Sequence, residues 1–199
     1  MLLNTSKSNV ITFTLRKTIT STPVTINGSE ITEDEQTKLL GVVFDRHLRF
    51  STHIETILKK AKPSFHALVQ LRRTGVTPSG PLLFYCSRIR SILTYAAPCW
   101  FSYLSHQDRD KLERYQRLCL RIILPHEDCY SKRLATLEIC TLTQYLEDLC
   151  TQYVAKLHNT NHPLHHLVPK RTYNKRTGRA NTLKFRCSLL SKSLFYTHA

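Results

Sequence analysis

Residues 51–73 read STHIETILKKAKPSFHALVQLRR, and this stretch decides the class of fold. Its apolar residues recur at the three- and four-residue spacing of one helix face. They are Ile54, Ile57, Leu58, Ala61, Phe65, Leu68 and Leu71. Thr52 and Glu55 have the spacing of a capping box, which predicts the start of the helix. Because Pro63 has no backbone N–H to donate, we expect it to kink or split the helix. Arg72 and Arg73, followed by Gly75, predict its end.

The same helical spacing continues downstream. Pro78 in a first-turn position predicts a second helix, ended by Pro98. Ser105 and Asp108 predict the cap of a third, ended by Pro125. A short helix over 131–138 and a longer one over 142–157 follow. The expected core of the second helix is Leu82, Leu83, Cys86, Ile89, Leu93 and Ala96, and that of the third is Leu112, Tyr115, Cys119, Ile122 and Ile123.

Upstream of residue 51 the pattern favours short strands. We expect them at 10–15 (VITFTL), 24–26 (VTI) and 38–44 (KLLGVVF), the last one buried. Asn27-Gly28 is a hairpin turn signal. The acids between 30 and 35 indicate a solvated loop. A small three-strand element is marginal in water unless something covers it, so these strands look like part of a larger sheet.

The predicted fold is therefore mainly α: about three N-terminal strands, a bundle of about five helices, and a basic tail. We expect weak order from residue 159 onward, where the sequence turns polar. The corresponding parts are 1–50, 51–158 and 159–199. With only 5 Gly in 199 residues, an all-β fold is disfavoured.

The formal net charge of +15 is unevenly spread. All 14 acids lie at or before Asp148, whereas residues 149–199 hold nine Lys and Arg and no acid. A polyanionic partner, most simply nucleic acid, suits this balance because each neutralised phosphate releases counterions. The alternative is a solvated basic tail without a specific partner.

The N-terminus has no long apolar core, and no apolar run approaches a membrane helix. The 7 Cys are dispersed and odd in number, as expected of reduced thiols. We therefore expect an intracellular protein, nuclear or cytoplasmic, with neither secretion nor membrane insertion.

Four sequence blocks, in order, resemble the end of the palm and the thumb of non-LTR (LINE-type) retrotransposon reverse transcriptases. LNTSKS (3–8) resembles the short motif that ends the palm. KLLGVVFD (38–45), with Leu48, Phe50, His53 and Ile54, resembles the strand-turn-helix segment after the active site. YAAPCW (95–100) resembles a helix-end signature, and LERYQR (112–117) resembles the next helix.

The resemblance implies that residues 1–50 end the palm with a primer-gripping hairpin and that the thumb follows. In such polymerases the thumb lies along the template–primer duplex. The candidates for phosphate contact are Arg72, Arg73, Arg88, Arg90, Arg114, Arg117 and Arg121, with Lys170, Arg171, Lys175 and Arg176 in the tail. Arg114, Arg117 and Arg121 share one helix face, as backbone tracking requires, or form an ordinary solvated face paired with Asp110 and Glu113.

Nucleotidyl transfer needs carboxylates that hold two metal ions, which in the intact family would be Mg²⁺. The family takes them from an earlier palm strand and an aromatic-Ala-Asp-Asp hairpin. The nearest imitation, YLED (145–148), falls in a helical pattern. We therefore expect no catalytic residues, no cofactor, no small-molecule substrate and no enzymatic activity, with duplex binding at most.

Other constellations are weaker. His106, Asp108 and His158 imitate the iron triad of 2-oxoglutarate dioxygenases, although Asp108 fits a helix cap better. The strip at 38–60 also resembles the N-terminal segment of the eighth AlkB homologue, without its oxygenase core.

Two groups of histidine and cysteine residues could suggest a zinc site, but neither contains a closely spaced ligand pair such as Cys-x-x-Cys. Histidines on the surface are the simpler interpretation. The two groups are His158, His162, His165 and His166, and His126 with Cys129 and Cys140. Trp100 and Phe101 would plug the end of the bundle or stack on a base, and we favour the plug. Cys86, Cys119 and Cys150 indicate packing residues. A helical protein-interaction module is the remaining alternative for the whole chain.

Overall fold

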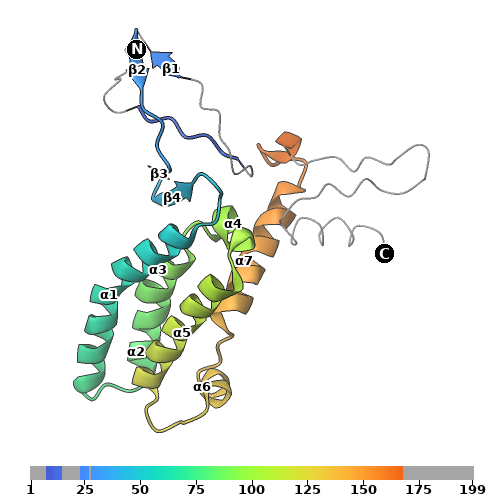
Figure 1. Cartoon of the computed structure of the whole chain (residues 1–199). Helices are drawn as coiled ribbons and strands as arrows, with labels where there is room; N and C mark the ends of the chain where they lie inside the picture. The colour runs from blue at the N-terminus through green and yellow to red at the C-terminus, as the bar shows by residue number, and fades with distance from the viewer. Residues whose placement is uncertain (1–7, 15–22, 27, 168–199) are drawn as a thin grey trace.

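Amphipathic helices packed side by side carry the core of the molecule, and two small β-hairpins lie at one end (Figure 1). The computed structural model describes residues 8–14, 23–26 and 28–167. The mainly helical fold with a small N-terminal β element is thus confirmed. The predicted weak order of the tail, beyond residue 167, lies outside the described residues.

The first hairpin pairs β1 (Val24–Ile26) with β2 (Ser29–Ile31) in antiparallel register. Gly28 has a φ of 76°, as the predicted turn requires. The sequence did not predict strand β2, and Glu30 lies within this strand rather than in a loop. Over the described part of 10–15, the predicted strand is wrong. Only an isolated bridge joins Val10 to Glu33 there.

The predicted buried strand over 38–44 is instead a second antiparallel hairpin, β3 (Gln36–Leu39) with β4 (Val42–Asp45). Leu40 and Gly41, with φ of 48° and 88°, make the two-residue turn between them. Positive φ at both central positions is the turn that matches strand twist. The apolar run is therefore not one buried strand: Val42 is buried, whereas Leu40 is 84% exposed at the tip.

Helix α1 (Ser51–Arg73) has the predicted bounds, and Arg72 and Arg73 occupy its last turn. Pro63 does not split it, because the helix is continuous across that residue. The predicted capping box is wrong. Phe50 precedes the helix with a φ of 60°, and no side chain caps it. Gly75 follows the end with a φ of 76°, and its N–H donates to the Arg72 carbonyl at 3.3 Å.

The second helical segment comprises α2 (Ser79–Phe84), the π-helical turn η2 (Tyr85–Arg90) and α3 (Ser91–Thr94). The wider turn shifts the buried face, because a π-helix adds a residue per turn. Pro81, Tyr85, Ile89 and Leu93 are buried, whereas the predicted core residue Leu83 is 70% exposed. The segment ends before Pro98, which lies in the next helix, α4 (Ala97–Trp100).

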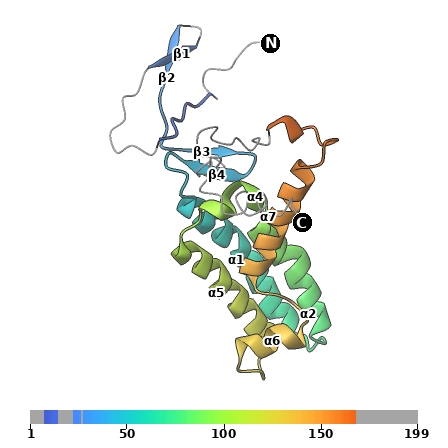
Figure 2. The same ribbon diagram turned by 90° about the vertical axis from the view of Figure 1, so that its right-hand side faces the viewer.

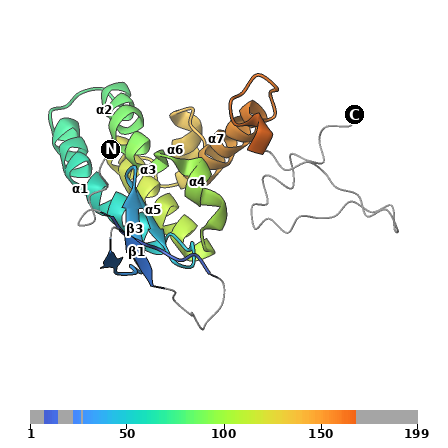
Figure 3. The same cartoon turned by 90° about the horizontal axis from the view of Figure 1, so that it is seen from above.

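The remaining helices are the 3-10 turn η3 (Phe101–Tyr103), α5 (His106–Ile123), α6 (Tyr130–Thr136), α7 (Leu142–Leu157) and η4 (His165–Leu167). Ser105 caps α5 as predicted, since its hydroxyl accepts from the Asp108 N–H. Helix α5 contacts α1, α6 and α7 (Figure 3). Helix α6 lies at the end of the bundle opposite the hairpins (Figure 2).

Aromatic residues fill the hairpin end of the core. Trp100, Phe101 and Phe50 are essentially fully buried. The Trp100 Nε1–H donates to the Tyr95 carbonyl at 2.9 Å. The expectation that Trp100 and Phe101 plug the bundle is confirmed, and Cys119 and Cys150 pack in the core as predicted.

Candidate nucleic-acid interface

The first turns of α1 and α5 are tied together at Asp108. Its carboxylate accepts from the Ser51 and Ser105 hydroxyls, both at 2.8 Å, and from the Lys111 ammonium at 2.7 Å. Burial alone would raise the pKa of Asp108, but the hydrogen bonds from Lys111, Ser105 and Ser51 bring it below its ordinary value. Farther along, the rings of Phe65 and Tyr115 lie 5.7 Å apart. The two helices therefore run side by side, starting from the same end.

Helix α1 carries a row of exposed basic residues on one face. Lys59, Lys62, His66 and Arg73 are spaced three, four and seven residues apart, so they share one face. Glu55 begins the row. The pKa of Lys111 on α5 is raised by its hydrogen bond to Asp108 and further by the nearby charges of Asp108 and Glu55. The charge of Glu55 thus acts on Lys111, so the Glu55 end of this face lies near α5.

Helix α5 supplies the other half of this surface. Arg114 and Arg121 are exposed, and neither forms an ion pair with an acid among the described residues. The predicted alternative was a solvated face paired with Asp110 and Glu113. The pairing with Glu113 is wrong because that carboxylate is turned inward to Thr143, and Asp110 forms no ion pair among the described residues. Lys59, Lys62 and Arg73 of α1 and Arg114 and Arg121 of α5 are thus exposed cations on two helices in contact, and we call these five residues the α1/α5 face.

The other predicted arginines take different positions. Arg117 lies over the Tyr130 ring at 4.8 Å, and Arg90 over the Tyr145 ring at 4.3 Å. Arg72 is half-buried, and its Nε has no hydrogen-bond partner among the described residues. Arg88 is exposed on η2. Arg73, Arg114 and Arg121 are exposed on helices α1 and α5, which contact each other, and Lys170, Arg171, Lys175 and Arg176 lie outside the described residues.

Lys59 and Lys62 were missed as candidates. Their signal was present in the sequence, because both fall on the polar side of the helix over 51–73. What could not be read was that α5, with its own exposed arginines, packs against α1.

The residues that resemble catalytic motifs in the sequence are not arranged as metal sites in the structure. Tyr145-Leu146-Glu147-Asp148 lies in the middle of α7, with Glu147 and Asp148 exposed on consecutive positions. Consecutive helical residues point about 100° apart, so this pair does not fit a shared Mg²⁺. Asp108 is occupied by Ser51, Ser105 and Lys111, as described above. Within the described ranges, no three His, Cys, Asp or Glu side chains are placed to hold a metal ion.

The C-terminal histidines bond to nearby backbone. His162 Nδ1 accepts from the Leu164 N–H at 3.1 Å, and His166 Nδ1 lies 2.9 Å from the Pro163 carbonyl. His165 Nδ1 lies 3.1 Å from the Leu157 carbonyl. These contacts hold the turns of the segment that follows α7.

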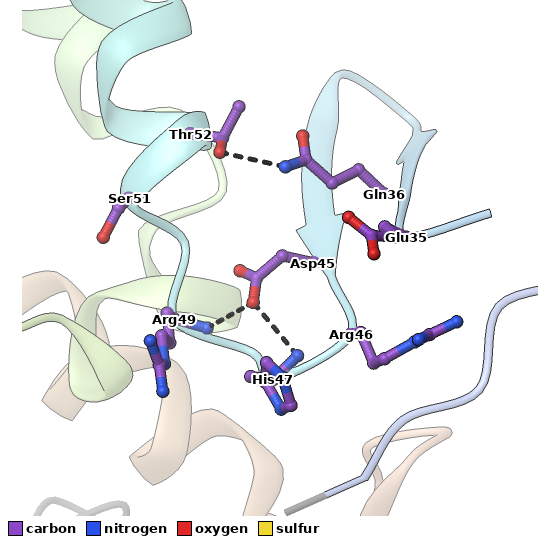
Figure 4. A pocket seen from close by; sticks show the side chains of 8 residues that line it. All are labelled: Glu35, Gln36, Asp45, Arg46, His47, Arg49, Ser51 and Thr52. Carbon is purple, nitrogen blue, oxygen red and sulfur yellow. Dashed lines mark hydrogen bonds between the residues drawn. The ribbon is translucent and has the colours of Figure 1, made fainter. Parts of the chain in front are cut away.

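A pocket of about 320 Å³ lies where β4 leads into α1 (Figure 4). Asp45 holds this connection: its carboxylate accepts from the backbone N–H groups of His47, Arg49 and Phe50 at 3.1, 3.0 and 2.6 Å. Arg46 pairs with Glu33 at 3.0 Å. The polar groups of this pocket thus join the hairpins to the bundle, and none of them caps α1.

A buried polar network behind α5 was also missed. The Gln116 amide donates to the Tyr130 hydroxyl at 2.9 Å and to the Cys140 carbonyl at 3.0 Å, while its oxygen accepts from the Tyr85 hydroxyl at 2.5 Å. The Tyr130 hydroxyl donates to Glu113. Glu113 and Gln116 belong to the LERYQR block (112–117), and the hydrogen bonds of both are structural.

The chain is similar in sequence to part of a transposon polymerase. Over 100 residues it is 32% identical to the probable RNA-directed DNA polymerase from transposon X-element of Drosophila melanogaster. The alignment covers 49% of this chain and 11% of that protein, so the chain spans a small part of its relative. No family model matches the chain, and no solved structure does either. About half of the chain is therefore similar in sequence to part of a transposon RNA-directed DNA polymerase. The resemblance of 38–60 to the AlkB homologue segment stays a prediction.

None of the helices in the described part of the chain is both long and apolar enough to cross a membrane.

Proposed function

We propose that residues 51–158 are a thumb-like bundle of a non-LTR (LINE-type) reverse transcriptase and bind the template–primer duplex. In the same proposal, residues 1–50 are the end of the palm with a primer-grip-like β element, and residues 159–199 are a basic tail. The similarity to the X-element polymerase supports this assignment, as does the helical bundle that follows the hairpins. The proposal assigns binding to this region and no step of nucleotidyl transfer.

The observation that carries the proposal is the α1/α5 face. Lys62 and Arg114 represent its two helices, and no acid among the described residues pairs with either. Residues 59–73 of one helix extend about 21 Å at 1.5 Å per residue, which matches several phosphate spacings of one strand. Phosphate contacts of this kind orient a duplex without reading its sequence.

The test is binding of the full chain to a blunt RNA–DNA duplex, measured by fluorescence anisotropy over a series of salt concentrations. Lys62→Gln with Arg114→Gln should weaken binding and reduce the slope of log K against log salt by about 2, close to one per lost phosphate contact. Lys132→Gln with Lys156→Gln removes the same charge from α6 and α7 and serves as the matched control.

Three results would contradict the proposal. They are no duplex binding at about 50 mM salt, a binding constant that does not depend on salt, or an equal loss in both double variants. The last of these would mean that total charge, rather than the α1/α5 face, attracts the duplex.

A further inference from the structure

A second pocket, of about 500 Å³, lies between the β3–β4 hairpin, α1 and α3. Ile57 and Ile92 provide its apolar lining, and Ser91 adds a hydroxyl. Lys38 comes from β3 and Lys60 from α1, so cations reach the pocket from two separate elements. No acid is among the lining residues, and neither lysine has an ion-pair partner among the described residues. The pocket is therefore suited to an anion that also has an apolar part.

Tyr95 forms one wall, and its position is held from two directions. Its hydroxyl donates to the Leu40 carbonyl at 3.0 Å, and its own carbonyl accepts from the buried Trp100 indole at 2.9 Å. Gly41 leaves room for the ring: a Cβ there would lie 3.3 Å from Tyr95 Cε1. Nevertheless Tyr95 is 54% exposed. An exposed ring whose orientation is already set loses little entropy when a flat ligand stacks on it.

We propose that this pocket holds one unpaired nucleotide of the bound nucleic acid, with the base against Tyr95 and Ile92 and the phosphate between Lys38 and Lys60. The inference rests on the proposed duplex binding and adds a separate single-strand site to it. Ammonium groups on two walls can bind phosphate oxygens, and an aromatic side chain accepts any base because every base has a flat face.

The position of the pocket relative to the α1/α5 face supports this assignment. Lys60 and Thr56 are one turn apart and line the pocket, whereas Lys59 and Lys62 belong to the α1/α5 face. Both sets are on the exposed surface of α1, and an α-helix with its side chains is about 10 Å across. A strand that leaves a duplex on the α1/α5 face therefore needs to cross only one helix to reach the pocket.

The experiment compares a blunt RNA–DNA duplex with the same duplex carrying a four-nucleotide single-stranded extension, using the full chain. We expect the extension to tighten binding about fivefold or more, the low end of what one stacked base contributes. Tyr95→Leu, and Lys38→Gln with Lys60→Gln, should abolish this gain and leave blunt-duplex affinity within about twofold. Tyr95→Phe keeps the ring but loses the hydroxyl bond to Leu40, so it should keep most of the gain.

Circular dichroism and thermal unfolding would be used to check that each variant is folded. If neither duplex binds, the proposed function fails. If the blunt duplex binds and the extension adds nothing, only the pocket inference fails. It also fails if Tyr95→Leu retains the gain. Competition by an oligoglutamate peptide against the extended duplex, but not the blunt one, would overturn it in favour of an acidic peptide as occupant.

Discussion

Glu113 of α5 accepts hydrogen bonds from both the backbone N–H and the hydroxyl of Thr143, each at 3.0 Å, at the start of α7. Its other oxygen accepts from Tyr130 of α6. One buried carboxylate thus joins three helices, and every group around it is a donor. Because Glu113 is directed inward, it does not pair with Arg114, its neighbour in the sequence and a member of the α1/α5 face.

Replacing Glu113 by Gln should destabilise the fold by about 1–3 kcal/mol, the cost of leaving a buried polar group without its partner. The new amide NH₂ would face a donor from either Thr143 or Tyr130. Urea unfolding followed by circular dichroism measures the change. Glu147→Gln, on the exposed side of α7, is the control and should stay within about 0.5 kcal/mol. Equal stability of Glu113→Gln and the native chain would show that the network contributes little.

His53 should make the fold sensitive to mild acid. The residue is fully buried, its Nδ1 accepts from the Val43 N–H at 3.3 Å, and its ring lies edge-on to Trp100. Burial lowers the pKa of His53 below its ordinary value of 6.5. The unfolded chain therefore binds this proton more readily, so stability is present above 6.5 and is lost as the pH falls from there through the lowered pKa.

Unfolding free energies measured at several pH values between about 5 and 7.5 test this dependence. His53→Asn keeps an acceptor near Val43 but cannot titrate. It should be less stable at neutral pH and show a flatter pH profile. His106→Asn, at an exposed position, should keep the native profile. A His53→Asn profile as steep as the native one would assign the acid sensitivity to other groups.

Cys129 should be a fast-reacting thiol among the described cysteines. It is exposed at the start of α6, and its pKa is lowered by the hydrogen bond with Ser131 and by backbone N–H groups of Lys132 and Ser131. Burial, in contrast, raises the pKa of Cys119 to about 12. Because the thiolate is the nucleophile, iodoacetamide at pH 7.5 should modify Cys129 first and Cys119 only after unfolding.

Peptide mapping by mass spectrometry gives the modification rate at each cysteine. Exposed Cys99 is the internal comparison. Ser131→Ala should bring the rate of Cys129 toward that of Cys99. If Cys129 reacts no faster than Cys99 in the native chain, the hydrogen bond does not activate it.

The turn of the β3–β4 hairpin offers a stabilising substitution. Leu40 has a φ of 48° and is largely exposed, so it is strained without burying its side chain. Asn tolerates this conformation and is preferred before Gly in such turns, so Leu40→Asn should stabilise by about 0.5–1 kcal/mol. Gly41→Ala, at a φ of 88° and next to Tyr95, should destabilise by about 1 kcal/mol or more. Thermal unfolding measures both, and a loss of stability in Leu40→Asn would mean that Leu40 has a packing role.

Local sequence signals predicted the helices well. The spacing of apolar residues over 51–73 and 142–157 corresponds to α1 and α7 residue for residue. Ser105 followed by Asp108 gave the start of α5, and Gly75 gave the end of α1. These features depend on residues within one or two turns of each other, and such short-range preferences can be read directly from the chain.

The errors occur where distant residues intervene. Leu83 was assigned to the core, but the π-helical turn at Tyr85–Arg90 rotates it to the surface. The strand over 38–44 became a hairpin because Leu40 accepts a strained φ, and its carbonyl is bonded by Tyr95, 55 residues away. Thr52 does not cap α1, and Asp45 instead holds the loop that precedes the helix.

The sequence by itself determined the helical class, most helix boundaries and the excess of positive charge, since periodicity, caps and composition are local or additive properties. Only the tertiary structure decided which cations lie together. Arg90 and Arg117 stack on tyrosines of other helices, whereas Lys62, Arg114 and Arg121 are left exposed on adjacent helices. The physical reason is that a basic surface over two helices depends on how they pack, and here Ser51, Asp108 and the Phe65–Tyr115 contact set that packing.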